Sequence, residues 1–202
     1  MPPIDIVDLD WEDGSDNTAG IGQYVYFAKK IDILTLPKPV LDDSTGDGNF
    51  EDLVTITDNI VMKPGKAFRK IYVTLEKGAL SHDIQGETDG KSNMNRLKFF
   101  MPGSEAKVLG FLQWAKNSSL IFLIPEIDGQ VRMLGHENYP AKLDTAPGGT
   151  GEKSADLKGT EFNFMSARKG PAPIFQGKVN VSSVGSGEDA DSDGEQDIIF
   201  ID

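Results

Sequence analysis

Short apolar runs separated by turn-forming residues recur along most of the chain, and within many of them apolar and polar residues alternate. Alternation places successive side chains on opposite faces of a strand, and the β-branched and aromatic residues in these runs favour strands over helices. We expect strands at residues 24–28, 53–57, 68–76, 96–101, 120–124, 131–134, 141–143, 160–165 and 174–181. Two further options are a continuation of the first strand through 31–34 and an edge strand at 4–9.

Helical periodicity is clear at residues 104–117. Val108, Phe111 and Ala115 recur at three- and four-residue spacing, which predicts one apolar stripe on an amphipathic helix. Ser104 follows a Pro-Gly pair and has a side chain that can accept hydrogen bonds from the amides of a first helical turn. We therefore expect the helix to begin at Ser104 and to pack its stripe against the sheet.

The run at 120–124 is apolar throughout and too short for a second helix, so it predicts a strand that is covered on both faces. Asp128-Gly129 suits a tight turn, which predicts a hairpin ending at 134. At 160–165 the alternation predicts that Phe162 and Phe164 point inward. Phe100 falls on the polar face of its own strand and therefore needs an apolar partner.

Together these elements predict a mainly β protein, an antiparallel β-sandwich or barrel with one packed α-helix. We expect a single domain over residues 1–184, with long loops at about 37–52, 81–95 and 144–158, followed by an acidic C-terminal extension at 185–202. The second of these loops joins two strands, so it is either irregular or a projecting hairpin.

The composition argues against several classes of function. The chain has 202 residues, a net charge of −12 and no cysteine, which excludes disulfides, thiol catalysis and zinc sites built on thiolates. Its acidity argues against holding nucleic acid, because phosphate binding draws on clustered Lys and Arg. A mean hydropathy of −0.31 argues against a membrane span. The start at residues 1–5 lacks the basic and then apolar segments of a secretion signal, so none is expected.

Two segments resemble binding motifs but depart from them at key positions. Residues 148–154 resemble a phosphate-binding loop, yet Pro147 and Glu152 stand where that motif needs glycine. The acidic run 189–194 matches the first half of a calcium loop, yet Phe200 stands where a bidentate Glu is required. We interpret the first as an ordinary loop and the second as a solvated acidic tail.

The remaining titratable residues do not form a catalytic pattern. His82 and His136 are isolated in polar stretches, and the acidic pairs 42–43 and 51–52 lie in loop-like sequence rather than in a cleft. We therefore assign no catalytic, cofactor-binding or metal-ligating residue, and we predict no cofactor and no enzymatic activity. What remains is a β domain whose open strand edges and apolar chain end suit self-assembly.

The segment from about 68 to 181 resembles the tail tube (major tail) proteins of tailed bacteriophages, especially those of Bacteroidetes phages and prophages. The features that carry this resemblance are residues 103–112, 128–135, 139–143, 149–151 and 159–164. The resemblance implies a structural virion protein that forms stacked, hexameric rings by joining sheets between identical copies. Such a tube contacts other tail proteins and passes the genome during DNA ejection without binding it specifically. It also implies synthesis in the bacterial host cytoplasm and a final location in the phage tail.

Two alternatives stay open on the sequence. Another ring protein of the tail or neck, such as a tail terminator, shares the build and differs in whether rings stack. The second is a monomeric β-sandwich module that binds sugar or peptide, with calcium at the acidic tail as a further option. For the tube, ring-to-ring contacts are expected in residues 37–52, in residues 81–95 or at either terminus.

Overall fold

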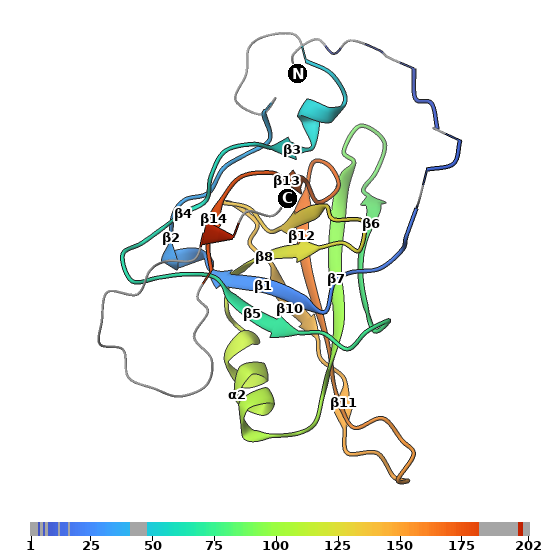
Figure 1. Cartoon of the computed structure of the whole chain (residues 1–202), viewed down its shortest axis with the longest axis vertical. Coiled ribbons are helices and arrows are strands. Elements are labelled where there is room, and N and C mark those ends of the chain that lie inside the picture. The colour runs from blue at the N-terminus through green and yellow to red at the C-terminus, as the bar shows by residue number, and fades with distance from the viewer. Residues whose placement is uncertain are drawn as a thin grey trace.

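The protein is a β-sandwich with one α-helix, as the apolar pattern predicts (Figure 1). The computed structural model describes residues 4, 6, 8–11, 13–15, 17–40, 48–181 and 198–199. Two large sheets face each other across a shared apolar core, to which the helix also contributes.

The first sheet has six strands in the order β3-β13-β9-β8-β1-β5. Neighbours are antiparallel except β3 and β13, which are parallel. The bounds are β3 Thr55–Ile56, β13 Ile174–Phe175, β9 Val131–Leu134, β8 Leu120–Pro125, β1 Tyr24–Lys29 and β5 Arg69–Tyr72. The expected hairpin is confirmed by the pairing of β8 with β9, and Gly129 in its turn has a φ of 93°.

The second sheet has the order β10-β12-β7-β6, with β11 pairing beside β12. Its strands are antiparallel, and β12 and β7 pair over their whole length. The bounds are β10 Lys142–Thr145, β11 Gly148–Gly149, β12 Gly159–Arg168, β7 Ser92–Pro102 and β6 Gly78–Gln85. Two smaller pairs complete the described strands: β2 Ile33–Thr35 with β4 Val61–Met62, and β14 Val179–Asn180 with β15 Ile198–Ile199.

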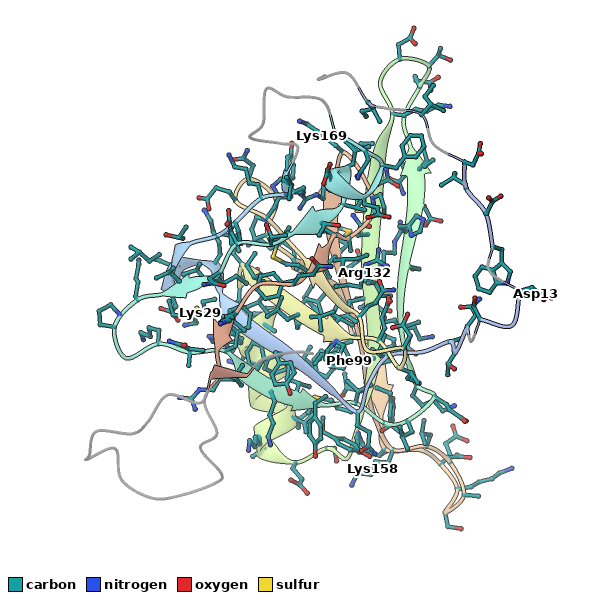
Figure 2. The ribbon with its side chains drawn as sticks, turned by 45° about the horizontal axis from the view of Figure 1, so that its top comes forward. Asp13, Lys29, Phe99, Arg132, Lys158 and Lys169 are labelled. Carbon is teal, nitrogen blue, oxygen red and sulfur yellow. The ribbon has the colours of Figure 1, made fainter. Side chains whose placement is uncertain are left out.

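Aromatic side chains fill the space between the two sheets. Phe162 and Phe164 of β12 are fully buried there, as predicted, and Phe99 of β7 stacks on both with ring centroids 5.4 and 6.0 Å away. Phe122 of β8, in the first sheet, packs against Phe164, with the two ring centroids 4.7 Å apart. The two sheets therefore contact each other directly through aromatic rings. Figure 2 shows Phe99 in the interior.

A second apolar cluster lies on the other face of the first sheet. Ile121 and Leu123 of β8 point into it, while Phe122 points the opposite way. Met62 of β4 and Val179 of β14 belong to segments outside this sheet that contribute to the cluster, and the rings of Phe68 and Phe175 are almost completely buried in it. The prediction that the run 120–124 is covered on both faces is therefore confirmed.

The helix α2 spans Ala106–Ala115, and its apolar stripe packs as expected. Phe111 makes edge contacts with Phe27 of the first sheet and Phe162 of the second, at 5.5 and 5.3 Å. The predicted start at Ser104 is wrong, because Glu105 occupies the cap position and no side chain caps the helix. The amide of Gly103 donates to the Lys158 carbonyl, and Gly103 has a φ of 88°, which is not a helical conformation.

Several predicted strands are shorter than expected or are divided. The strand at 53–57 is reduced to β3, since Glu51–Leu53 form the short 3-10 helix η2. The continuation through 31–34 is wrong, because the 3-10 helix η1, Lys30–Asp32, turns the chain so that β2 pairs with β4 instead of prolonging β1. In residues 4–9, Ile4 makes an isolated bridge with Gly48 and the other described residues form no strand.

Two further strands end early for local reasons. The strand expected at 68–76 stops at Tyr72, and Glu76 adopts a φ of 59° in the turn that follows. The last expected strand divides into β13 and β14 around Gly177, where an added Cβ would lie 2.1 Å from the Asp58 carbonyl oxygen. The apolar C-terminal run does find a partner, because β15 pairs with β14 of the same chain.

Candidate assembly surface

The hairpin formed by β6 and β7 resolves the question left open for residues 81–95. Eight residue pairs hold its two strands together, from Gly78 with Phe99 to Gln85 with Ser92. The turn needs glycine at Gly86, which has a φ of 110° and where a Cβ would lie 2.4 Å from the Gly90 carbonyl oxygen. The segment is therefore a regular hairpin, and Figure 1 shows it projecting beyond the body of the sandwich.

Strand β6 forms a long, open edge of the second sheet. Six of its eight residues are exposed, and within the described chain it pairs only with β7. Its pairing with β7 has no bulge, and Asp83 is its only Asp, Glu, Lys or Arg residue. Stable monomers usually blunt such edges with lysines, prolines, bulges or short strands. This edge has none of those protections.

The opposite edge of the same sheet is formed by β10. Three of its four residues are exposed, and a bulge interrupts its register with β12 between Leu143 and Thr145. The edges of the first sheet are shorter: β3 has two residues and β5 has four. The second sheet therefore offers the longer backbone edge to a neighbour.

The outward face of the second sheet carries paired charges. Arg96 forms an ion pair with Asp83 across β7 and β6, and Lys98 Nζ lies 3.0 Å from Glu161 Oε2 across β7 and β12. The hydrogen bond from Lys98 lowers the pKa of Glu161, although burial opposes the shift. Two cations of this face, Arg96 and Lys98, are thus each paired with a carboxylate.

Phe100, for which the sequence demanded an apolar partner, is buried on this same face. It is 8% exposed, and its ring lies against Gly159, where an added Cβ would come within 2.4 Å of Phe100 Cζ. Leu157 lines the same shallow hollow. The missing side chain at Gly159 therefore provides the space that Phe100 occupies.

Polar contacts anchor the base of the projecting hairpin. Asn95 is 2% exposed and donates from Nδ2 to the Gly170 carbonyl at 3.2 Å, and Asn93 donates likewise to the Lys169 carbonyl at 3.0 Å. His136 lies nearby, with Nε2 3.1 Å from the Ala167 carbonyl oxygen. The two asparagine bonds fix the hairpin base to the turn after β12. The contact of His136 with the Ala167 carbonyl gives this histidine a structural role.

The loop that resembles a phosphate-binding motif has its amides occupied. Asp156 Oδ2 accepts hydrogen bonds from the backbone amides of Glu152 and Lys153, each at 2.9 Å. These bonds lower the pKa of the exposed Asp156 carboxyl group. The amides that a phosphate would need are therefore bound by a carboxylate of the chain itself.

The other candidates do not gather into a site. The acidic pair 42–43 and the calcium-like run 189–194 lie outside the described residues. Asp52 exchanges two hydrogen bonds with Asn49, each at 3.0 Å, at the start of η2. His82 is exposed on β6. Among the described residues, no three His, Asp or Glu side chains are grouped closely enough to hold a metal ion. None of the helices described is both long and apolar enough to cross a membrane.

Sequence reasoning missed a lysine-rich cleft beside η1. Lys29, Lys30 and Lys63 line it together with Glu137, and Figure 2 labels Lys29 on the side of the molecule away from Asp13. Lys30 Nζ lies 2.5 Å from Glu137 Oε1, and Lys29 Nζ lies 5.0 Å from the centre of the Trp114 ring. The dipeptide Lys29-Lys30 was the available signal, but nothing in the sequence brought Lys63 beside it.

Sequence analysis left strand β6 as one of two alternatives for residues 81–95, although Leu80, His82 and Ile84 alternate with small or polar residues. No protein-family model, curated protein or solved structure matches the chain. The β6 and β10 edges of the second sheet form the candidate assembly surface, and its geometry is the basis for a functional proposal.

Proposed function

We propose that this chain is a structural subunit that assembles with identical copies through the edges of its second sheet, as the tail tube subunit of a tailed bacteriophage. The observation that carries the proposal is the β6 edge, which is eight residues long, exposed and without a bulge. Rings of subunits, hexameric in the family that the sequence resembles, would stack into the channel through which DNA is ejected from the virion.

The physical argument rests on unpaired backbone groups. A strand edge presents amides and carbonyls that are satisfied by water in the monomer and by a neighbouring strand in an assembly. Pairing β6 of one copy with β10 of the next would continue the second sheet from subunit to subunit. Because such a head-to-tail contact uses two different edges, it closes into a ring when the rotation between subunits allows closure.

The charges on the outward face are compatible with a channel for DNA. The pairs Arg96–Asp83 and Lys98–Glu161 neutralise two cations of this face that could otherwise hold phosphates. The net charge of −12 adds long-range repulsion of a polyanion. Both features favour passage of DNA over specific binding.

Electron microscopy of the purified protein tests the proposal directly. Long tubes of stacked rings are expected for a tail tube subunit. Single rings that do not stack would instead support a terminator or neck protein, which is the nearest alternative. A protein that remains monomeric at high concentration would contradict assembly and favour a monomeric binding module.

Cysteine cross-linking tests which edges meet. Because the chain contains no cysteine, a double variant such as Ser81→Cys on β6 with Lys142→Cys or Asp144→Cys on β10 has no competing thiols. Disulfides require Cα atoms about 4.4 to 6.8 Å apart, so a ladder of cross-linked oligomers is expected only if these edges pair. The matched control places the second cysteine at Lys70 on β5, an edge of the first sheet. Tubes in which the control cross-links and the β10 variants do not would contradict this arrangement.

A further inference from the structure

The segment before β1 carries large apolar side chains that the subunit itself does not cover. The N-terminal loop, by which we mean the described residues 8–11 and 13–15, contains neither helix nor strand, and each of these residues is exposed. Leu9 is 84% and Trp11 is 67% exposed. Because tryptophan is enriched among the residues that dominate protein interfaces, this loop is a candidate for contact with another surface.

Carboxylates alternate with these apolar side chains. Asp8 and Asp10 lie on either side of Leu9 in the sequence, and Asp13 follows in the same loop. In an extended chain, Asp8 and Asp10 project to one side while Leu9 and Trp11 project to the other. A surface that binds the loop must therefore offer cations together with apolar side chains.

The lysine-rich cleft beside η1 supplies the cations. Lys29, Lys30 and Lys63 contribute three ammonium groups to it, whereas Glu137 contributes a carboxylate. Glu137 is paired with Lys30. In the part of the chain that the structure describes, no ion pair engages Lys29 or Lys63. The cleft thus retains two positive charges that would attract the carboxylates of a ligand.

The same cleft supplies the apolar side chains. Ile31 and Leu34 line it and are 71% and 65% exposed. Covering them together with Leu9 and Trp11 would remove apolar surface of both partners from water, which favours association. The cleft and the loop therefore match in apolar character as well as in charge.

The loop and the cleft lie on opposite sides of one subunit. Figure 2 labels Asp13 on one side and Lys29 on the other, and in Figure 1 the dark blue start of the chain lies on the side opposite β2. Isolated bridges at Ile4 and Ile21 anchor the loop on its own side. A contact between loop and cleft therefore joins two copies head to tail and can repeat from copy to copy.

We propose that the N-terminal loop of one copy docks into the lysine cleft of a neighbouring copy, with Asp8 and Asp10 facing Lys29 and Lys63. This inference rests on the proposed self-assembly and adds to it a contact made by side chains. The backbone edges of the second sheet and this contact would then join the subunits through different chemistry.

Zero-length cross-linking of the assembled full-length protein tests the contact. A carbodiimide joins a carboxylate to an amine that it touches, and equal amounts of unlabelled and ¹⁵N-labelled protein are mixed before assembly. Mass spectrometry is expected to find Asp8 or Asp10 linked to Lys63, with half of these links joining peptides of different isotopic composition. Lys153, which is exposed outside the cleft, serves as the control amine and is expected not to link to the loop.

The outcomes separate this inference from the proposed function. Rings or tubes without a link between the loop and Lys63 would overturn this inference alone. A protein that stays monomeric and forms no link between copies would overturn both. Links confined to peptides of one isotopic composition would also overturn the inference, because the loop would then reach the cleft of its own copy.

Charge reversal provides an independent measurement. Lys29→Glu with Lys63→Glu is expected to raise the protein concentration needed for assembly by roughly three- to tenfold at low salt, and by less at high salt. Adding Asp8→Lys and Asp10→Lys to that variant should restore assembly, because the two charge patterns again match. The matched control, Lys107→Glu with Lys153→Glu, changes the net charge equally outside the cleft. An equal effect of the control, or no rescue by the loop lysines, would contradict the contact.

Discussion

The two sheets of this protein differ in how many of their faces are buried. The first is covered on both faces at its strand β8: Phe122 packs toward the second sheet, and the adjacent Leu123 packs against the segments on the opposite side. The second is covered on one face only. Leu97 of β7 is buried, whereas the next residue, Lys98, has a 53% exposed side chain.

This difference separates residues that stabilise the fold from residues that can contact another molecule. A sheet buried on both faces has no side of its own to offer a partner, so its residues act mainly through packing. A sheet with one wet face and a long open edge can present both to another molecule. We therefore expect substitutions in the first sheet to unfold the protein, and suitable changes in the second sheet to alter assembly while the fold is kept.

The largest effects are expected in β8. Phe122→Ala should lower the free energy of unfolding by about 3–5 kcal/mol and Leu123→Ala by about 2–5 kcal/mol, because each opens a cavity in a different core. Urea denaturation followed by circular dichroism measures both. If either neighbour proved nearly neutral, the first sheet would not be covered on both faces.

Alanine substitutions at two neighbouring residues of β7 should change the free energy of unfolding by unequal amounts. Leu97→Ala should cost about 2–5 kcal/mol, because Leu97 is fully buried between the sheets. Lys98→Ala should change the free energy of unfolding by no more than about 0.5 kcal/mol, because its ion pair with Glu161 is exposed to solvent. Equal losses at the two positions would mean that the outward face is also packed against something.

The same contrast explains what the sequence could predict. The buried runs at 120–124 and 160–165 were recognised because apolar residues placed on one or both faces leave a pattern in the chain itself. The helix was recognised for the same reason. Its start was misplaced because Gly103 is held by the Lys158 carbonyl, a contact between residues far apart in the sequence.

The open edge and the cleft leave a weaker signal. Strand β6 buries little, so its polar residues read as a loop, and its pairing becomes visible only when β7 lies beside it. The cleft unites Lys29 and Lys63 because η1 turns the chain so that β2 meets β4. Surfaces assembled by such tertiary contacts have no local pattern. For that reason the sequence left the hairpin undecided against an irregular loop and gave no sign of the cleft.

Shortening the hairpin should separate assembly from folding. Replacing residues 84–93 by Asn-Gly joins Asp83 to Met94, which face each other in the natural hairpin, through a two-residue turn. The hydrogen bond from Asn95 to Gly170 is retained and the one from Asn93 to Lys169 is lost, so the free energy of unfolding should fall by about 0.5–1.5 kcal/mol. Tube formation, seen by electron microscopy, should be weakened. Tubes of normal length from this variant would contradict a role for the hairpin end.

The smallest effect compares one glutamate on each sheet, and the two should respond to pH in opposite directions. Burial raises the pKa of Glu126, at the end of β8, above its ordinary value of 4.5, although Arg132 opposes the shift. The folded protein then binds this proton more tightly than the unfolded chain, so Glu126 costs stability as pH rises from about 4.5 through the raised pKa. Glu126→Gln should therefore gain stability relative to the natural protein over that rise.

Glu161, on the outward face of the second sheet, has a pKa lowered mainly by its hydrogen bond from Lys98. Its stabilising contribution is present above the pKa of the unfolded chain and is lost as pH falls through the lowered value. Glu161→Gln should thus be less stable than the natural protein at pH 6, and the difference should shrink toward pH 3. Melting temperatures of both variants across this range provide the measurement. Parallel pH profiles would mean that burial, rather than the open face with its paired charges, governs both carboxylates.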